Sequence, residues 1–223
     1  MRSNGTMRID GPTFTPHQIM GALKTGALLI DLRPHEQFAS GHIPGSISVV
    51  FSRKSLSQRI ATAIPPGPPI ILFADDAGIA EAAHDALYGV QRNPLLGLAT
   101  TGIAPWHGTG LPLATLPRIS VAVLQQHLTA PDTTLSLIDV REPFEWELGY
   151  INGSLLIPLG EIRHRIASLD PGNQIVLICQ EGLRSATAAS ILLHHHFSRV
   201  SHVTGGLGSW LDADYPTVRP TRE

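Results

Sequence analysis

Short apolar runs alternate along the chain with longer stretches that mix polar and apolar residues. The runs span residues 27–32, 69–74 and 95–100 in the first half and 135–140, 174–179 and 199–204 in the second. Short continuous runs of this kind are typical of strands buried on both faces of a parallel sheet. Between the last two, residues 183–197 place apolar side chains three and four positions apart, which predicts a helix. The alternation predicts α/β domains.

The pattern occurs twice. Residues 29–46 match residues 137–154 at a constant offset of 108, with eight identical positions. Upstream, Thr15 followed three residues later by Gln18 predicts the capping box of a helix start, and Ser120 marks the corresponding start in the second copy. The duplication therefore covers most of the chain and predicts two successive domains of the same fold.

Length and linker composition place the boundary between the two copies. A chain of 223 residues fits two domains of roughly 100 to 120 residues each. Residues 108–117 contain the Gly and Pro of a linker. We predict a first domain over residues 1–116 and a second over residues 117–223.

Composition narrows the classes of function. The net charge is −2 and there is no block of Lys or Arg, so neither nucleic acid nor an anionic membrane is an expected partner. The first fourteen residues lack the apolar stretch of a secretory signal, and no long apolar window predicts a spanning helix. A single cysteine cannot form an internal disulfide. We expect a soluble cytoplasmic protein.

That cysteine, Cys179, follows directly on a predicted strand. The segment from Cys179 to Ser185 turns into a helix, at the strand edge where α/β proteins bind ligands. The helix start leaves N–H groups unpaired, and a tight loop with Gly182 directs further N–H groups toward one centre. Arg184 adds a permanent positive charge. This arrangement predicts a stabilised thiolate that holds an anionic persulfide or a sulfonate-like leaving group.

Four motifs of the second copy resemble the rhodanese family, which combines D-[VL]-R, G-H-I-x-G-[AS], a C-x-x-G-x-R loop and G-G-x-x-x-W. Tyr150 and Asn152 replace the commoner His and Pro of the second motif, and Glu181 puts a negative charge inside the loop. The matching residues are Asp139-Val140-Arg141, residues 149–154, Cys179 to Arg184, and Gly205-Gly206 with Trp210. The resemblance implies two tandem rhodanese-like domains, each a mainly parallel sheet flanked by helices.

The resemblance also implies a reaction. Cys179 would take a sulfane sulfur from thiosulfate or a low-molecular-weight persulfide, hold it as a persulfide, and pass it to a thiol, sulfite or cyanide. Arg184 would orient the donor, and Asp139 and Arg141 would brace the loop from the neighbouring strand end. Neither a cofactor nor a metal is implied. The backbone N–H groups that would bind the substrate belong to Gln180, Glu181, Gly182, Leu183, Arg184 and Ser185.

The second copy is also similar to rhodanese domains that are fused to, or encoded beside, persulfide dioxygenases. This similarity implies small sulfur-containing anions or thiols as substrates. It implies a persulfide dioxygenase or another sulfur-relay protein as a partner. We therefore expect a role in sulfide or persulfide oxidation.

The first copy lacks the chemistry of the second. Aligning the two loops places Ala74 opposite Cys179 and Ile79 opposite Arg184, so both nucleophile and cation are missing. Asp76, with its neighbour Asp75, would repel an anionic donor. We predict that the first domain is catalytically inert.

Two other functions are compatible with parts of this sequence. Cysteine-dependent phosphatases and arsenate reductases of related fold have a loop one residue longer, C-x5-R, and the shorter loop here fits a single sulfur better. A non-catalytic module that senses or presents sulfur to a protein partner stays open. A metal site is not predicted at the three consecutive histidines, residues 194–196, because consecutive helical side chains point in different directions.

Overall fold

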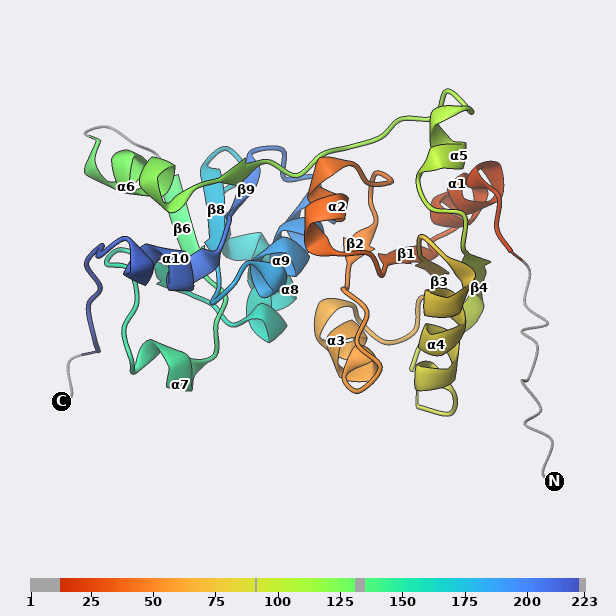
Figure 1. The fold of residues 1–223 in the computed structure, drawn as a ribbon, viewed down its shortest axis with the longest axis horizontal. Coiled ribbons are helices and arrows are strands. Elements are labelled where there is room, and N and C mark those ends of the chain that lie inside the picture. Colours follow the sequence, from red (N-terminus) through yellow and green to blue (C-terminus); the bar gives the residue numbers. More distant parts are fainter. Residues whose placement is uncertain (1–12, 91, 131–134, 221–223) are drawn as a thin grey trace.

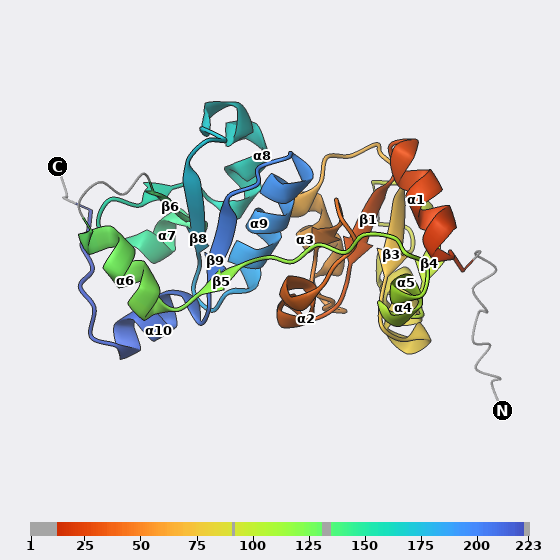
Figure 2. The same ribbon diagram turned by 90° about the horizontal axis from the view of Figure 1, so that it is seen from above.

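The computed structural model describes residues 13–90, 92–130 and 135–220. Most of the segment on which the secretory-signal prediction rests, residues 1–12, lies outside the described part. Figures 1 and 2 show two lobes side by side, each a sheet with helices packed around it, joined by an extended segment between α5 and α6. No described helix is long and apolar enough to cross a membrane.

The first lobe contains a four-stranded parallel sheet in the order β2-β1-β3-β4. The predicted capping box is present, because the Thr15 hydroxyl accepts from the Gln18 amide and the Gln18 side chain accepts from the Thr15 amide. The strands are β1 (Leu28–Asp31), β2 (Ile47–Ser48), β3 (Ile70–Phe73) and β4 (Leu95–Ala99). The helices are α1 (Pro16–Lys24), α2 (His35–Ser40), α3 (Leu56–Ala63), α4 (Ala77–Leu87) and α5 (Ala104–His107).

The second lobe contains a five-stranded parallel sheet in the order β5-β9-β8-β6-β7. The prediction of two tandem α/β domains with mainly parallel sheets is confirmed. The strands are β5 (Arg118–Ile119), β6 (Leu135–Asp139), β7 (Leu155–Leu156), β8 (Gln174–Ile178) and β9 (Val200–Val203). The helices are α6 (Val121–Thr129), α7 (Pro143–Trp146), α8 (Ile162–Arg165), α9 (Leu183–His194) and α10 (Gly206–Asp212), with 3-10 turns η1 (Leu159–Glu161) and η2 (Ile166–Ser168).

Helix α9 joins the two lobes. It begins directly after the cysteine loop, and all eight residues from Ser185 to Leu192 are buried because the first lobe covers the side that would otherwise face water. The Ser190 hydroxyl accepts from the Ser48 amide at 3.0 Å, and His194 Nδ1 lies 2.8 Å from the Gly45 carbonyl oxygen. A single apolar cluster runs through both lobes around this helix. The helix ends at His194, earlier than the predicted end at residue 197.

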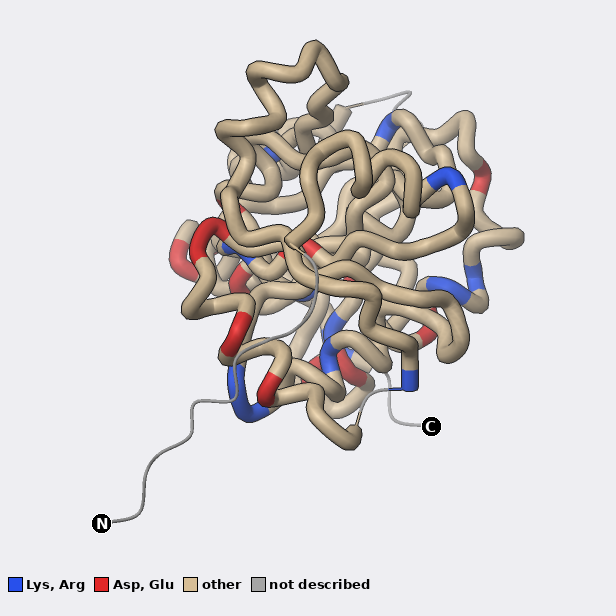
Figure 3. The backbone as a smooth tube through the Cα atoms, turned by 90° about the vertical axis from the view of Figure 1, so that its right-hand side faces the viewer, with Lys and Arg blue, Asp and Glu red and all other residues tan. Residues whose placement is uncertain are grey.

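The segment between the lobes is attached to the first of them. Ala114 and His42 exchange two backbone hydrogen bonds of 2.9 Å, and the buried Leu116 donates its amide to the Ala39 carbonyl oxygen. The chain then enters the second sheet as β5. Acidic and basic positions are interspersed over the described chain (Figure 3).

Candidate active site

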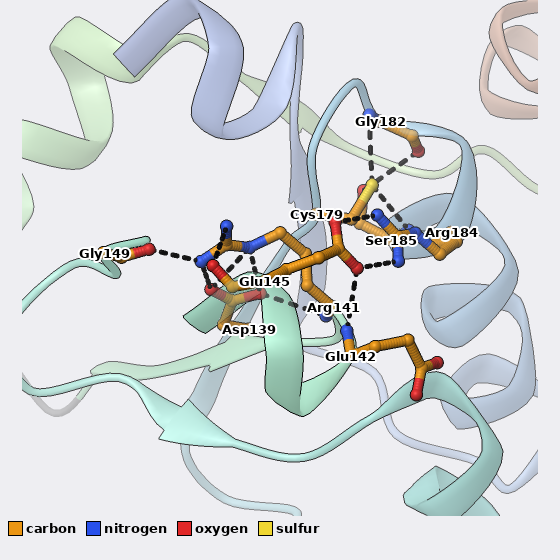
Figure 4. Close-up of polar contacts among 9 residues, drawn as sticks. All are labelled: Asp139, Arg141, Glu142, Glu145, Gly149, Cys179, Gly182, Arg184 and Ser185. Atoms are coloured by element: carbon orange, nitrogen blue, oxygen red, sulfur yellow. Dashed lines mark hydrogen bonds and ion pairs between the residues drawn. The ribbon is translucent and has the colours of Figure 1, made fainter. Parts of the chain in front are cut away.

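Cys179 lies at the carboxyl end of β8, inside a turn of backbone N–H groups. Its sulfur accepts hydrogen bonds from the amides of Gly182 at 3.1 Å and Ser185 at 3.4 Å (Figure 4). Gly182 has a φ of 111°, in the left-handed region that favours glycine, and this conformation directs its amide at the sulfur. Four other loop amides have no acceptor within the described chain, namely those of Gln180, Glu181, Leu183 and Arg184.

The opposite side of the loop is fixed by the start of α10. The Leu207 amide donates to the Cys179 carbonyl oxygen at 2.8 Å, and the Gly208 amide donates to the Gln180 carbonyl oxygen at 3.0 Å. In a trans peptide the C=O and the following N–H point in opposite directions, so a carbonyl held against α10 leaves the next N–H on the far side. The glycine motif that precedes Trp210 thus orients the cysteine loop.

The guanidinium of Arg184 is bound to a carboxylate that sequence reasoning did not single out. It donates to both Glu145 oxygens, at 2.5 and 2.8 Å (Figure 4). The hydrogen bond from Arg184 lowers the pKa of Glu145 below its usual range. The positive charge that we predicted Arg184 to add to the loop is therefore balanced by Glu145 in the structure. Proline at 143 signals a helix start near Glu145, but nothing local in the sequence pairs Glu145 with a residue 39 positions away.

Asp139 and Arg141 hold the element that carries Glu145. The Arg141 guanidinium binds the Asp139 carboxylate at 2.7 Å and the Gly149 carbonyl oxygen at 2.8 Å, with a longer contact of 3.4 Å to the Glu145 carbonyl oxygen. The first bond fixes the guanidinium to the end of β6, and the other two hold α7 and the turn after it against that end. The pair therefore contacts α7 directly, and reaches the cysteine loop through Glu145 and Arg184.

A cavity of about 550 Å³ lies in front of the loop, between the two lobes. Cys179 lines it although its exposed fraction is 1%, so a substrate would meet the sulfur inside this cavity. Arg59 lines the cavity from the first lobe, with Nη1 donating to the Val50 carbonyl oxygen at 2.9 Å. Among the lining residues, all of them described, Arg59 is the cation without a carboxylate partner. The first lobe contributes Val49, Val50, Ser55, Gln58, Arg59 and Thr62; the second contributes Glu142, Glu145, Leu159, Cys179, Gln180, Glu181, Leu183, Arg184 and Thr187.

In the corresponding loop of the first lobe, a carboxylate caps the start of the following helix. Ala74 follows β3 at the position of the cysteine and is buried. The Asp76 carboxylate accepts from the Ile79 amide at 2.9 Å and so caps α4. A helix start whose amide already binds an internal anion has less positive potential to offer a second one. The first lobe therefore has no sulfur at this position, and the Ile79 amide of its helix start is already bound to Asp76.

Sequence comparison agrees with this geometry. A family model described as the rhodanese-like domain matches residues 15–106 and again residues 120–213. The chain belongs to the rhodanese-like domain family. Both lobes are rhodanese-like domains, and the tandem arrangement predicted from the internal repeat is confirmed.

Relatives of this rhodanese-like chain carry names that refer to sulfur. A protein of Allochromatium vinosum named "Sulfurtransferase" is 31% identical over 97 residues, which are 44% of this chain and 90% of the relative. The "Putative sulfur carrier protein YrkF" of Bacillus subtilis is 35% identical over 97 residues, 44% of this chain and 52% of that protein. The chain thus spans about half the length of the Bacillus relative.

One solved structure with a similar fold covers both domains. It is a thiosulfate sulfurtransferase from Pseudomonas aeruginosa, 22% identical, with a TM-score of 0.44 over 95% of this chain and 44% of the other.

Proposed function

We propose that this protein is a sulfurtransferase that works through a persulfide on Cys179. It takes the sulfane sulfur of thiosulfate or a low-molecular-weight persulfide and delivers it to a thiol, sulfite or cyanide. The observation that carries the proposal is the ring of loop amides around the sulfur, two already directed at it and four without an acceptor in the described chain. Such donors stabilise an anionic sulfur without metal or base.

The transfer takes place in two displacements. The Cys179 thiolate attacks the outer sulfur of thiosulfate, a new S–S bond forms, the old S–S bond breaks, and sulfite leaves with the electron pair. The terminal sulfur of the persulfide carries the negative charge in the amide ring. An acceptor thiolate then attacks that terminal sulfur and takes it, which returns Cys179 to the thiolate.

Charges in the cavity favour a donor with one anionic end. The carboxylates of Glu142 and Glu181 line the cavity and disfavour highly charged anions. The guanidinium of Arg59, which has no carboxylate partner within the described chain, attracts a sulfonate or carboxylate. A donor held between Arg59 and the loop would place its sulfane sulfur near Cys179. In this proposal the first domain is inert and yet contributes to donor binding. The partner we propose is a persulfide dioxygenase or another sulfur-relay protein.

The decisive experiment is the mass of the intact protein after incubation with thiosulfate or glutathione persulfide. Because Cys179 is the only cysteine, a single added sulfur on the wild-type protein can be assigned to it directly. Cys179→Ala should gain none. A matched control moves the thiol to the inert domain, in the double variant Ala74→Cys with Cys179→Ala. That thiol would face a capped helix start, so we expect no stable added sulfur.

Two outcomes would contradict the proposal. A wild-type protein that stays unmodified with every donor would favour the non-catalytic module that senses or presents sulfur. Equal persulfide formation at position 74 in the control would show that the amide ring around Cys179 has no special role.

Arg59→Ala should raise the KM for thiosulfate about tenfold, because one charge-assisted contact to the anionic end is worth roughly 1.5 kcal/mol. The kcat should change little, since Arg59 does not touch the loop. Steady-state kinetics of sulfite release measure both constants. Arg53→Ala is the control, because Arg53 is exposed and approaches Asp85 outside the cavity. A lower kcat with unchanged KM for Arg59→Ala would refute this assignment.

A further inference from the structure

Behind the sulfur lies a buried polar pair that the amide ring does not include. The Ser185 hydroxyl oxygen is 3.6 Å from Cys179 Sγ, and His202 Nδ1 is 3.4 Å from the same oxygen. His202 comes from β9, next to the strand that ends at the cysteine, and its exposed fraction is 1%. Its other ring nitrogen, Nε2, is buried and has no hydrogen-bond partner among the residues that the structure describes.

The hydrogen bonds around Ser185 determine where its hydroxyl hydrogen points and which ring nitrogen of His202 carries the hydrogen. The hydroxyl donates its one hydrogen to the Gly182 carbonyl oxygen at 2.9 Å, so its lone pairs face Cys179 and His202. An oxygen that only accepts requires an N–H from the imidazole, which places the hydrogen on Nδ1. Burial lowers the pKa of His202 to about 4, so this ring is neutral near pH 7. The unpartnered Nε2 is then a lone pair.

The first domain shows that the fold forms without this pair. On β4, Leu98 pairs with Leu72, two residues before Ala74; on β9, His202 pairs with Leu177, two residues before Cys179. Leu98 and His202 are thus equivalent positions. The second domain has Cys179, Ser185 and His202 where the first has Ala74, Ala80 and Leu98, all three buried.

The comparison of the two domains indicates a functional role for the pair of Ser185 and His202. A buried imidazole with an unpartnered nitrogen costs stability relative to leucine at the same place. The costly pair lies in the domain that has the thiol, and apolar residues fill the same positions in the domain without one. The stability that the Ser185–His202 pair costs is therefore offset by an effect on the chemistry of the Cys179 thiol.

We propose that His202 is a positioning residue that acts through Ser185 on the charged sulfur of Cys179. This inference rests on the proposed function and adds a third donor to its site. When the thiol becomes a thiolate or persulfide, the Ser185 hydroxyl turns its hydrogen from the Gly182 carbonyl oxygen to the sulfur. The His202 Nδ1–H keeps the hydroxyl oxygen in place during that turn. No proton is transferred to His202.

Several charged or titratable groups face the pair from neighbouring elements. Arg184 on α9 interacts electrostatically with Cys179. His35 and Glu36 on α2 and Arg118 on β5 interact electrostatically with His202. The ring of His35 lies 6.1 Å from that of His202, centroid to centroid. All of these groups stay in place in the variants below, so a difference between variants reports the pair itself.

The test is the pH dependence of Cys179 alkylation by iodoacetamide, which reports the thiolate and needs no sulfur donor. His202→Leu, which copies the first domain, should move the midpoint up by about one pH unit, a tenfold loss of thiolate below it. Its melting temperature should stay equal or rise. Ser185→Ala should give the same shift, and the double variant no more than Ser185→Ala alone. His202→Asn, which supplies a side-chain N–H, should recover part of the loss.

An unchanged alkylation profile in His202→Leu would overturn the inference. So would a double variant whose shift equals the sum of the shifts of His202→Leu and Ser185→Ala. A profile that shifts together with a large loss of melting temperature would also overturn it, because the residue would then be structural. Failure of the proposed function is seen separately, as wild-type protein that alkylates normally and yet gains no sulfur. His42→Leu, a buried histidine of the first domain, serves as the control and should leave the profile unchanged.

Discussion

Replacing Gly206 by alanine is expected to eliminate persulfide formation and to lower the free energy of unfolding by about 3 kcal/mol or more. Gly206 has a φ of 59°, and a Cβ there would overlap the Cys179 carbonyl oxygen and the backbone of Gln180. Both partners are backbone atoms of the cysteine loop, so the overlap is relieved only by moving the loop. Moving the loop breaks the hydrogen bonds from the Leu207 and Gly208 amides to the loop carbonyls, and these bonds turn the loop amides toward the sulfur.

The same helix provides the control for this prediction. Gly208 lies two residues further, its conformation suits any residue, and a Cβ there would meet the Gln180 carbonyl oxygen at an ordinary 3.4 Å. Gly208→Ala should therefore keep both stability and persulfide formation. Urea denaturation and intact mass after thiosulfate measure the two quantities. Wild-type behaviour of Gly206→Ala would show that the start of α10 does not set the loop.

Acidification from about pH 6.5 to about pH 4 is expected to destabilise the protein by up to roughly 6 kcal/mol through two buried histidines. Burial lowers the pKa of both His42 and His202 to about 4 in the folded protein, against 6.5 for the unfolded chain. Between these values the unfolded chain binds more protons, so stability is complete above the unfolded pKa and falls as pH drops toward the folded one. Each histidine contributes about 3 kcal/mol.

Urea titrations at several pH values in this window test the prediction, and His202→Leu is its internal control. That variant has one titrating histidine fewer, so its stability should fall about half as steeply with decreasing pH. The lowered carboxyl pKa of Glu145 adds a loss of stability as pH falls below about 4.5, but the Glu145–Arg184 pair is present in both proteins and cancels in the comparison. Constant stability across the window would mean that the two imidazoles stay accessible to water.

The two domains use one fold for different purposes. In the second, the helix start after β8 is left open and its amides face a sulfur; in the first, Asp76 caps the equivalent start. The first domain nevertheless covers α9 and supplies the outer wall of the cavity, including Arg59. The domain without a cysteine thus still contributes a packing surface and side chains to the cavity.

The main secondary-structure elements and the cysteine loop could be predicted from the amino-acid sequence. Period and turn residues located the main strands, and the repeat at an offset of 108 predicted two domains of one fold. The capping box at Thr15 and Gln18 was readable because capping residues lie within one helical turn. The cysteine loop was readable for the same reason, since its chemistry is contained in seven consecutive residues. The two-residue strands β2, β5 and β7 escaped prediction because so short a segment has no period.

The distant groups that surround the sulfur could be found only once the chain was folded. Glu145 compensates Arg184 across 39 positions, His202 reaches Ser185 across 17, and Arg59 enters the cavity from the other domain. Strand order and domain packing bring these residues together, and neither leaves a local signal. A hydrogen bond or an ion pair depends on distance in space, whereas hydrophobic pattern and helix or strand propensity report only on neighbours along the chain.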